Sequence, residues 1–135
     1  RADLLTVGAD GRVSRVSGLI AQARALASDG GLARYELLLV PWLWRLRLGA
    51  RQRAWQGKSL RQILDGVFAS YQPRAAWRWA PGVDEHLEAL GPPDYLAQGR
   101  ESDLAFVQRV LARGGLGLRF EEVDGEDDAA GLGHR

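Results

Sequence analysis

Apolar side chains recur with a helical period in two parts of this chain. In the first part, they lie three or four residues apart between residues 60 and 71, which places them on one face of a helix. Ser59 precedes this stripe and Gln62 follows three residues later. This is the spacing of a capping box, in which each side chain bonds the backbone N–H of the other residue. The pattern predicts an amphipathic helix near residues 59–71, ended before Pro73.

The second helical stripe lies between residues 103 and 113. Its apolar face holds Leu104, Val107, Val110 and Leu111. Ser102 is the predicted N-cap, and Asp103 in the first turn complements the positive end of the helix dipole. Gly114-Gly115 is predicted to end the helix, because glycine readily adopts the left-handed conformation of a C-cap.

Turn signals before residue 50 predict paired strands. Asp29-Gly30-Gly31 separates two apolar stretches, and glycine supplies the positive φ that a tight hairpin turn needs. The apolar run from Tyr35 to Leu48 is therefore predicted to be one long strand that pairs back on residues 12–26. Pro41 interrupts this run and has no N–H to donate, so we expect an edge position or a bulge there.

Two shorter strands, at 76–79 and 116–120, are predicted from alternating apolar residues, and residues 94–98 are a further brief strand candidate. Residues 80–93 contain three prolines and two glycines and are predicted to be mostly loop. The elements together predict an α+β fold over residues 1–122, a mainly antiparallel β framework with two amphipathic helices. Six of the eight residues 121–128 are acidic, so residues 123–135 are predicted to be a disordered or truncated tail.

Composition narrows the classes of function. The chain has 135 residues, of which 46% are apolar, enough for a buried core. Its net charge of +1 gives no general attraction to nucleic acid or to an anionic membrane, and no apolar run reaches the ~18 residues of a membrane span. The absence of cysteine excludes disulfides and thiol catalysis. Because the chain does not begin with methionine, we expect it to be a piece of a longer protein.

Two groups of residues are candidates for site chemistry. His86 stands among Asp84, Glu85 and Glu88, but a zinc site needs about four well-placed ligands, so a solvated loop is favoured over a metal site. Glu101 and Asp103 form the most suggestive carboxylate pair for general acid–base catalysis. They straddle a predicted helix start, where acids are favoured by the free N–H groups, so capping is the favoured interpretation. No serine lies in a G-x-S-x-G motif and no phosphate loop occurs, so no catalytic, cofactor-binding or metal-binding residue is assigned.

Four arginines lie close together in the sequence, at positions 45, 47, 51 and 53, beside Trp42, Trp44 and Trp55. Arginine with aromatic side chains is one pattern of nucleic-acid binding. The acids elsewhere in the chain and the near-neutral net charge favour ion pairing instead, either within the fold or across a subunit contact.

Four blocks of sequence, in order, resemble blocks of the VgrG family, the spike proteins of bacterial type VI secretion. The most specific runs from Gln98 to Leu111 and contains Arg100-Glu101-Ser102-Asp103, which is similar to the family's Q-Y-R-E-S-D block, with Gly99 in place of the tyrosine. The others are residues 17–20, 34–46 and 53–64. Residues 114–120 depart from the family's more aromatic E-G-I-x-Y-x-F.

The resemblance covers the N-terminal part of that family, which is similar to contractile-phage tail hub proteins with tube-like barrel elements. It implies a structural, non-enzymatic hub segment of a homotrimeric spike, without a cofactor, that stacks on the Hcp tube and meets baseplate and spike-tip proteins. It further implies assembly in the bacterial cytoplasm followed by translocation through the type VI apparatus. A tail hub of a prophage or another contractile injection system is the nearest alternative. A hydrolase using Glu101 and Asp103 is the alternative of a different class.

Overall fold

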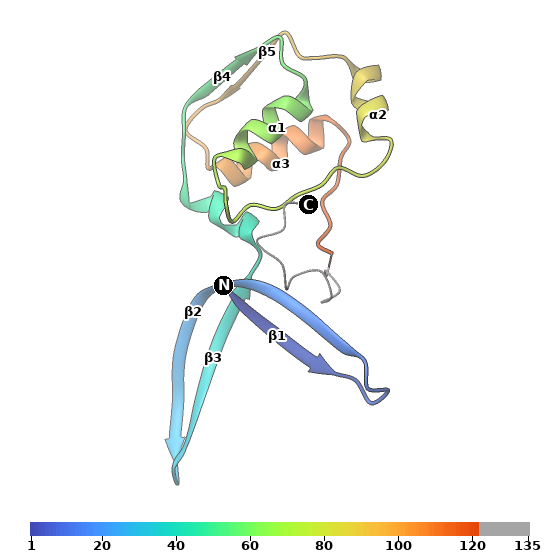
Figure 1. Cartoon of the computed structure of the whole chain (residues 1–135). Coiled ribbons are helices and arrows are strands. Elements are labelled where there is room, and N and C mark those ends of the chain that lie inside the picture. Colours follow the sequence, from blue (N-terminus) through green and yellow to red (C-terminus); the bar gives the residue numbers. More distant parts are fainter. Residues whose placement is uncertain (122–135) are drawn as a thin grey trace. The chain divides into compact units, whose positions relative to one another are not determined.

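The computed structural model describes residues 1–121, so the predicted tail at 123–135 lies outside the described residues. Two compact units divide this part of the chain, one formed mainly by residues 1–42 and the other by residues 43–119. Figure 1 shows the three strands of the first unit and the helices of the second. The mixed α+β class is confirmed, and both sheets pair antiparallel, with no closed barrel among residues 1–121.

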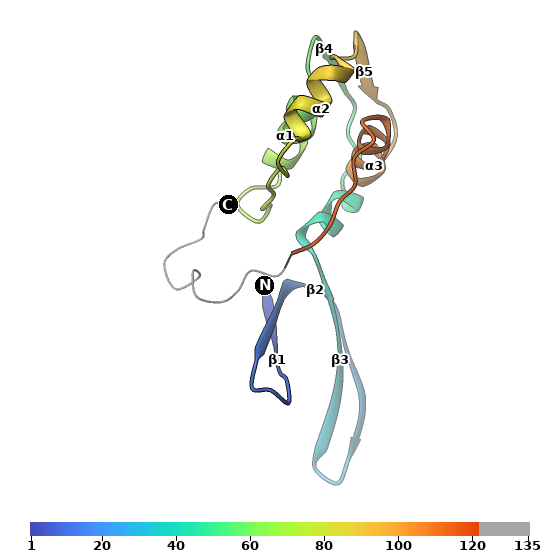
Figure 2. The same cartoon turned by 90° about the vertical axis from the view of Figure 1, so that its right-hand side faces the viewer.

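The first unit is built on one long strand, β2 (Val13–Asp29). Its first part pairs with β1 (Ala2–Val7), and its remainder pairs with β3 (Leu32–Val40). Figures 1 and 2 show the two resulting hairpins diverging from the middle of β2. Gly30 and Gly31 form the turn of the second hairpin with φ of 55° and 87°. Positive φ at both positions is the two-residue hairpin turn that the sequence predicts.

The long strand predicted to reach Leu48 is wrong beyond Val40. After Pro41 the chain forms a 3-10 helix, η1 (Trp42–Leu48), because proline cannot continue the hydrogen-bonded ladder. Leu43 and Leu46 are the buried residues of η1, and their spacing of three residues matches one turn of this helix type. Arg45 and Arg47 therefore lie on a helix and not on the predicted strand.

The second unit packs two helices against a short strand pair. Helix α1 (Leu60–Ala69) and helix α3 (Asp103–Arg113) supply most of the core, and β4 (Arg53–Gln56) pairs with β5 (Tyr95–Gln98). The most deeply buried apolar side chains are Leu46, Ile63, Leu64, Val67, Phe106, Val107 and Val110. The ring of Trp55 on β4 stacks on Phe106 at a centroid distance of 4.9 Å, which joins the strands to α3.

The predicted helix ends are confirmed. The Ser59 hydroxyl accepts from the Gln62 backbone at 3.2 Å, and the Gln62 side chain accepts from the Ser59 backbone at 3.0 Å. Ser102 caps α3 by accepting from the backbone N–H of residue 105. Gly115, with φ of 64°, closes α3. The N–H of Leu116 then donates to the Leu111 carbonyl at 2.9 Å, which is the long bond of a Schellman motif.

Three local predictions fail in the second unit. Residues 83–90, predicted to be loop, form helix α2 (Val83–Leu90), with Leu87 as its buried residue. Residues 76–79 and 116–120 are not strands, because no strand among residues 1–121 pairs with either segment. The strand predicted at 94–98 is confirmed as β5, whereas its partner strand β4 was not predicted. No helix of the described part is both long and apolar enough to cross a membrane.

Candidate functional site

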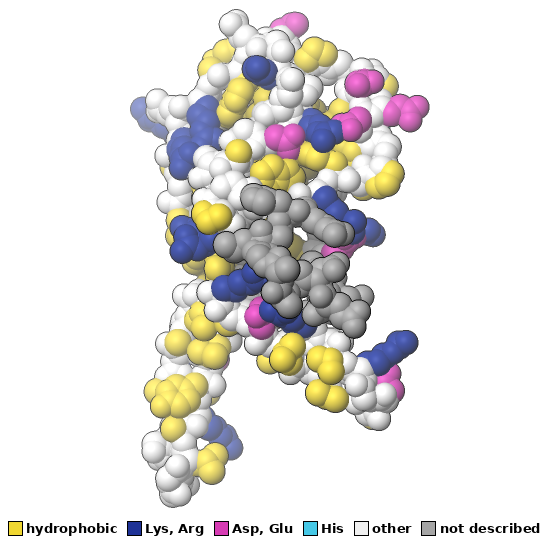
Figure 3. Space-filling view, in the orientation of Figure 1, with side chains coloured by type: hydrophobic (Ala, Val, Ile, Leu, Met, Phe, Trp, Pro, Cys, Tyr) yellow, Lys and Arg dark blue, Asp and Glu magenta, His cyan; other side chains and the backbone are white. Residues whose placement is uncertain are grey.

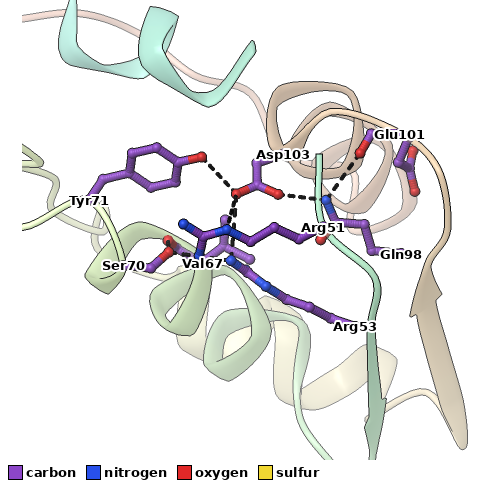
Figure 4. A network of polar contacts seen from close by, with 8 residues as sticks. All are labelled: Arg51, Arg53, Val67, Ser70, Tyr71, Gln98, Glu101 and Asp103. Carbon is purple, nitrogen blue, oxygen red and sulfur yellow. Dashed lines mark hydrogen bonds and ion pairs between the residues drawn. The ribbon is translucent and has the colours of Figure 1, made fainter. Parts of the chain in front are cut away.

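The carboxylate of Asp103 is the centre of the main polar cluster in the second unit, shown in Figure 4. Its side chain is fully buried at the start of α3. Oδ1 accepts from Nε2 of Gln98 on β5 at 2.6 Å, and Oδ2 accepts from the hydroxyl of Tyr71 after α1 at 2.7 Å. The backbone N–H of Asp103 donates to the Gly49 carbonyl at 2.9 Å. One residue therefore ties together four segments of the unit.

Two arginines neutralise this buried charge. Arg53 and Arg51 place guanidinium nitrogens 3.5 and 3.8 Å from Oδ2 of Asp103. Arg51 also lies over the ring of Tyr71, at 5.7 Å from its centroid. A buried carboxylate needs such partners, because an unpaired charge removed from water costs several kcal/mol (roughly 3–5).

The phenol of Tyr71 responds to the same surroundings. Its burial, followed by its hydrogen bond to Asp103, raises the pKa of Tyr71 from 10.0 to about 12. Both effects disfavour the phenolate, which would face a carboxylate at hydrogen-bond distance. The phenol therefore stays protonated as a donor over the ordinary pH range.

Glu101 does not join this cluster. Its carboxylate accepts from Arg109, whose guanidinium also donates to the Ala97 carbonyl at 2.8 Å. The structure thus places the two predicted carboxylates on separate partners, Glu101 near the surface and Asp103 in the interior. A catalytic carboxylate pair would have both groups facing one reacting site, whereas here each carboxylate is held by its own arginine partners.

His86 lies on helix α2, where the sequence predicted an acidic loop. Its Nε2 is 2.8 Å from the carbonyl oxygen of Gly114, which can only accept, so Nε2 carries the hydrogen. Asp84, its neighbour on α2, pairs with Arg61. Across residues 1–121, no group of three or more histidine, cysteine or acidic side chains is placed to hold a metal ion.

A second cluster, which the sequence did not predict, surrounds Asp65 on α1. Oδ1 of Asp65 accepts from the indole N–H groups of Trp77 and Trp79 at 2.8 and 2.9 Å. Arg61 lies over the Trp79 ring at 5.7 Å and bridges Asp65 and Asp84. These residues line an open hollow of about 580 Å³. The alternation of Trp77 and Trp79 indicated a strand. The sequence did not reveal their shared acceptor, because Asp65 lies twelve and fourteen residues earlier in the chain.

The first unit presents a different kind of surface. Large apolar side chains are exposed on all three strands, at Leu4, Leu5, Val7, Val13, Val16, Ile20, Leu26, Leu32, Tyr35, Leu37 and Leu38. Figure 3 shows hydrophobic side chains along both hairpins. Leu37 and Leu38 are neighbours on β3 and so point to opposite faces, and they are 56% and 47% exposed. Both faces of the hairpin are therefore exposed at this point of β3.

Comparison with protein families gives one match over nearly the whole chain. The family described as phage tail baseplate hub (GPD) matches residues 2–135. This match includes the exposed hairpins of the first unit and the Asp103 cluster of the second.

Comparison with curated proteins gives several relatives among type VI secretion system spike proteins. VgrG2a of Pseudomonas aeruginosa is 33% identical over 87% of this chain, and VgrG1a of the same organism is 27% identical over 73%. VgrG3 of Vibrio cholerae is 28% identical over 83%. The matches span 14%, 14% and 10% of the three relatives' own lengths. The resemblance predicted from the four sequence blocks is confirmed.

Proposed function

This chain belongs to the phage tail baseplate hub family, and on that premise we propose that it is a structural segment of a type VI secretion spike. In this proposal the hub segment assembles around a threefold axis and stacks on the Hcp tube. The gene product that carries it is assembled in the bacterial cytoplasm and then translocated. The similarity to spike proteins of two organisms supports this reading.

The observation that carries the proposal is the uncovered surface of the first unit. An isolated two-stranded hairpin is at best marginally stable in water, and long apolar edge strands invite pairing with another chain. Leu4 and Leu5 on β1, like Leu37 and Leu38 on β3, expose apolar side chains on both faces. Burial against neighbouring subunits or the tube removes this surface from water, at about 25 cal/mol per Å² of apolar area.

The second unit supports a structural role in a different way. The carboxylate of Asp103 accepts hydrogen bonds from Gln98 and Tyr71 and forms ion pairs with the two arginines. The carboxylate of Glu101 forms an ion pair with Arg109. These contacts fix helices and strands relative to one another within the unit. We assign the cluster to rigidity of the hub segment and assign no residue to catalysis.

A hub of a prophage or another contractile injection system is the second candidate, because the description of the matched family is that of a phage tail baseplate hub. The two candidates differ in the tube on which the segment stacks. A spike segment binds Hcp rings in preference to phage tail-tube protein, and a phage hub shows the opposite preference.

Co-sedimentation with assembled Hcp tubes tests the proposal. We expect the gene product that carries this chain to sediment with Hcp tubes, and we expect the double variant Leu5→Asp/Leu37→Asp to lose that binding. Leu118→Asp, in the second unit, is the matched control, because Leu118 is also exposed, at 50%. Equal binding by all three proteins would contradict the assignment of the hairpins to assembly. Binding to phage tail-tube protein alone would favour the second candidate.

A further inference from the structure

Some arginines of the second unit pair with carboxylates and others do not. Residues 37–64 contain no acid, but they contain five arginines and Lys58. Arg51 and Arg53 share Asp103, and Arg61 pairs with Asp65 and Asp84. Arg45 and Arg47 on η1 have no carboxylate partner among residues 1–121. Arg47 is instead held over the ring of Trp44, at 4.9 Å.

The geometry of η1 places these residues away from its buried side, with Trp44 and Arg45 half-buried and Arg47 exposed. A 3-10 helix has about three residues per turn, so side chains three apart lie on one ridge. Leu43 and Leu46 form the buried ridge. The two outer ridges carry Trp44 with Arg47, and Arg45 with Leu48, which is 70% exposed. We call these four outer residues the η1 surface. Tryptophan and arginine are the residues most enriched at the energetic centres of protein interfaces.

Helix α2 carries the complementary charge at another edge of the same unit. Asp84 forms an ion pair with Arg61, but Glu85 and Glu88 have no cationic partner among the described residues. They lie three apart, so they are neighbours on the helix surface. Leu90, at the end of α2, is 54% exposed. In Figure 1, η1 (the turquoise coil before β4) and α2 lie toward opposite sides of this unit.

We propose that the η1 surface of one copy contacts the outer face of α2 in the next copy. The two surfaces differ and face different ways, so the contact is head-to-tail, and a head-to-tail contact forms a ring when the rotation between copies closes. The charges are opposite in sign, and the two residues of each pair are separated by a similar rise along their helix axis. Arg45 and Arg47 are separated by about 4 Å along a 3-10 helix, and Glu85 and Glu88 by about 4.5 Å along an α-helix. Exposed Leu48 and Leu90 supply apolar area at the same contact. The inference rests on the proposed trimeric function and adds a contact that the hairpins do not supply.

An acidic protein surface fits these residues better than nucleic acid does. A groove for nucleic acid needs a row of free cations along the phosphates, and only two arginines of the four in the sequence cluster lack a carboxylate. One of them is already stacked on Trp44, so its side chain has less conformational freedom to lose when a partner binds.

Charge reversal in this chain tests the contact. Sedimentation velocity at millimolar concentration and low salt is expected to show weak self-association of the unaltered chain, which weakens as salt screens the charges. R45E/R47E and E85R/E88R are each expected to weaken it about tenfold or more, because each places like charges together. The fourfold variant R45E/R47E/E85R/E88R restores opposite charges and is expected to recover the association. K58E/R74E has the same charge change as R45E/R47E at other exposed positions and is the control.

Cross-linking gives a second measurement, because the chain contains no cysteine. Under oxidising conditions R47C/E88C is expected to form a ladder of dimers and trimers, whereas each single-cysteine variant stops at dimers. The inference is overturned if the unaltered chain stays monomeric at millimolar concentration, if the fourfold variant does not recover, or if R45E/R47E instead abolishes binding to single-stranded nucleic acid. Any of these results leaves the Hcp co-sedimentation result unchanged, so failure of this contact and failure of the proposed function are distinguishable.

Discussion

The hydroxyl of Tyr71 donates a hydrogen bond of 2.7 Å to the carboxylate of Asp103, thirty-two residues later in the chain. This contact joins the segment after α1 to the first turn of α3 inside the second unit. Asp103 is therefore more than a residue that complements a helix dipole, because its charge is also the anchor for Gln98, Arg51 and Arg53.

We expect Asp103→Asn to lower the free energy of unfolding by about 1.5–3 kcal/mol, as for the loss of hydrogen bonds to a charged group. A helix-dipole interaction alone would give only about 0.3–1 kcal/mol. Glu101→Gln is the control, since its partner Arg109 is half exposed, and such a pair contributes about 1 kcal/mol or less. Urea unfolding of the three proteins decides between these roles. A loss below that of Glu101→Gln would contradict the anchor role of Asp103.

The raised pKa of Tyr71 predicts a loss of stability in strong base. The unfolded chain releases this proton near the ordinary pKa of 10.0, and the folded chain retains it to about 12. The phenol's contribution is therefore complete below pH 10 and is lost as the pH rises through that interval. We expect the stability difference between the unaltered chain and Tyr71→Phe to shrink between pH 10 and pH 12. A difference that stays constant with pH would show that Tyr71 titrates normally.

The core of the second unit predicts large effects at two buried positions. Ile63 on α1 is 0% exposed and Leu111 on α3 is 5% exposed. Truncating either to alanine is expected to cost about 2–5 kcal/mol, through lost burial and the cavity left behind. Leu118→Ala is the control, because Leu118 is exposed. An unchanged denaturation midpoint for either core variant would mean that its helix does not pack as described.

Asp65 is expected to stabilise the fold mainly as a hydrogen-bond acceptor for the two indoles, and less through its charge. Asp65→Ala leaves the indole N–H groups of Trp77 and Trp79 without their acceptor, at a cost of about 1–3 kcal/mol. Asp65→Asn keeps a carbonyl oxygen at the same place and is expected to retain most of the stability. Indole N–H resonances in an NMR spectrum report the two bonds directly. Equal losses in both variants would assign the effect to the ion pair with Arg61 instead.

The sequence predicted those elements whose signals are local. Helices α1 and α3 carry both a period and a cap, so Ser59 and Ser102 mark their starts within one residue. The hairpin turn at Gly30-Gly31 is equally local, because glycine alone reaches its backbone angles at little cost.

The predictions that failed concern segments whose structure depends on contacts with other parts of the chain. The run after Pro41 reads as strand because an apolar stretch of this length suits either state, and only the burial of Leu43 and Leu46 identifies a 3-10 helix. Helix α2 is short, lies between glycines and buries chiefly Leu87, so its period is weak. The partners of Asp103 and Asp65 come from other elements, and periodicity within one segment carries no information about such pairs.

The molar mass of the gene product that carries this chain tests the central claim most directly. A spike or hub requires the exposed hairpins to be buried between subunits, so we expect light scattering at micromolar concentration to give a stable trimer. The isolated 135-residue chain is expected to be monomeric or weakly associated, and a tight trimer from it alone would show that the hub surfaces suffice for assembly. A gene product that remains monomeric at micromolar concentration would contradict the proposed function.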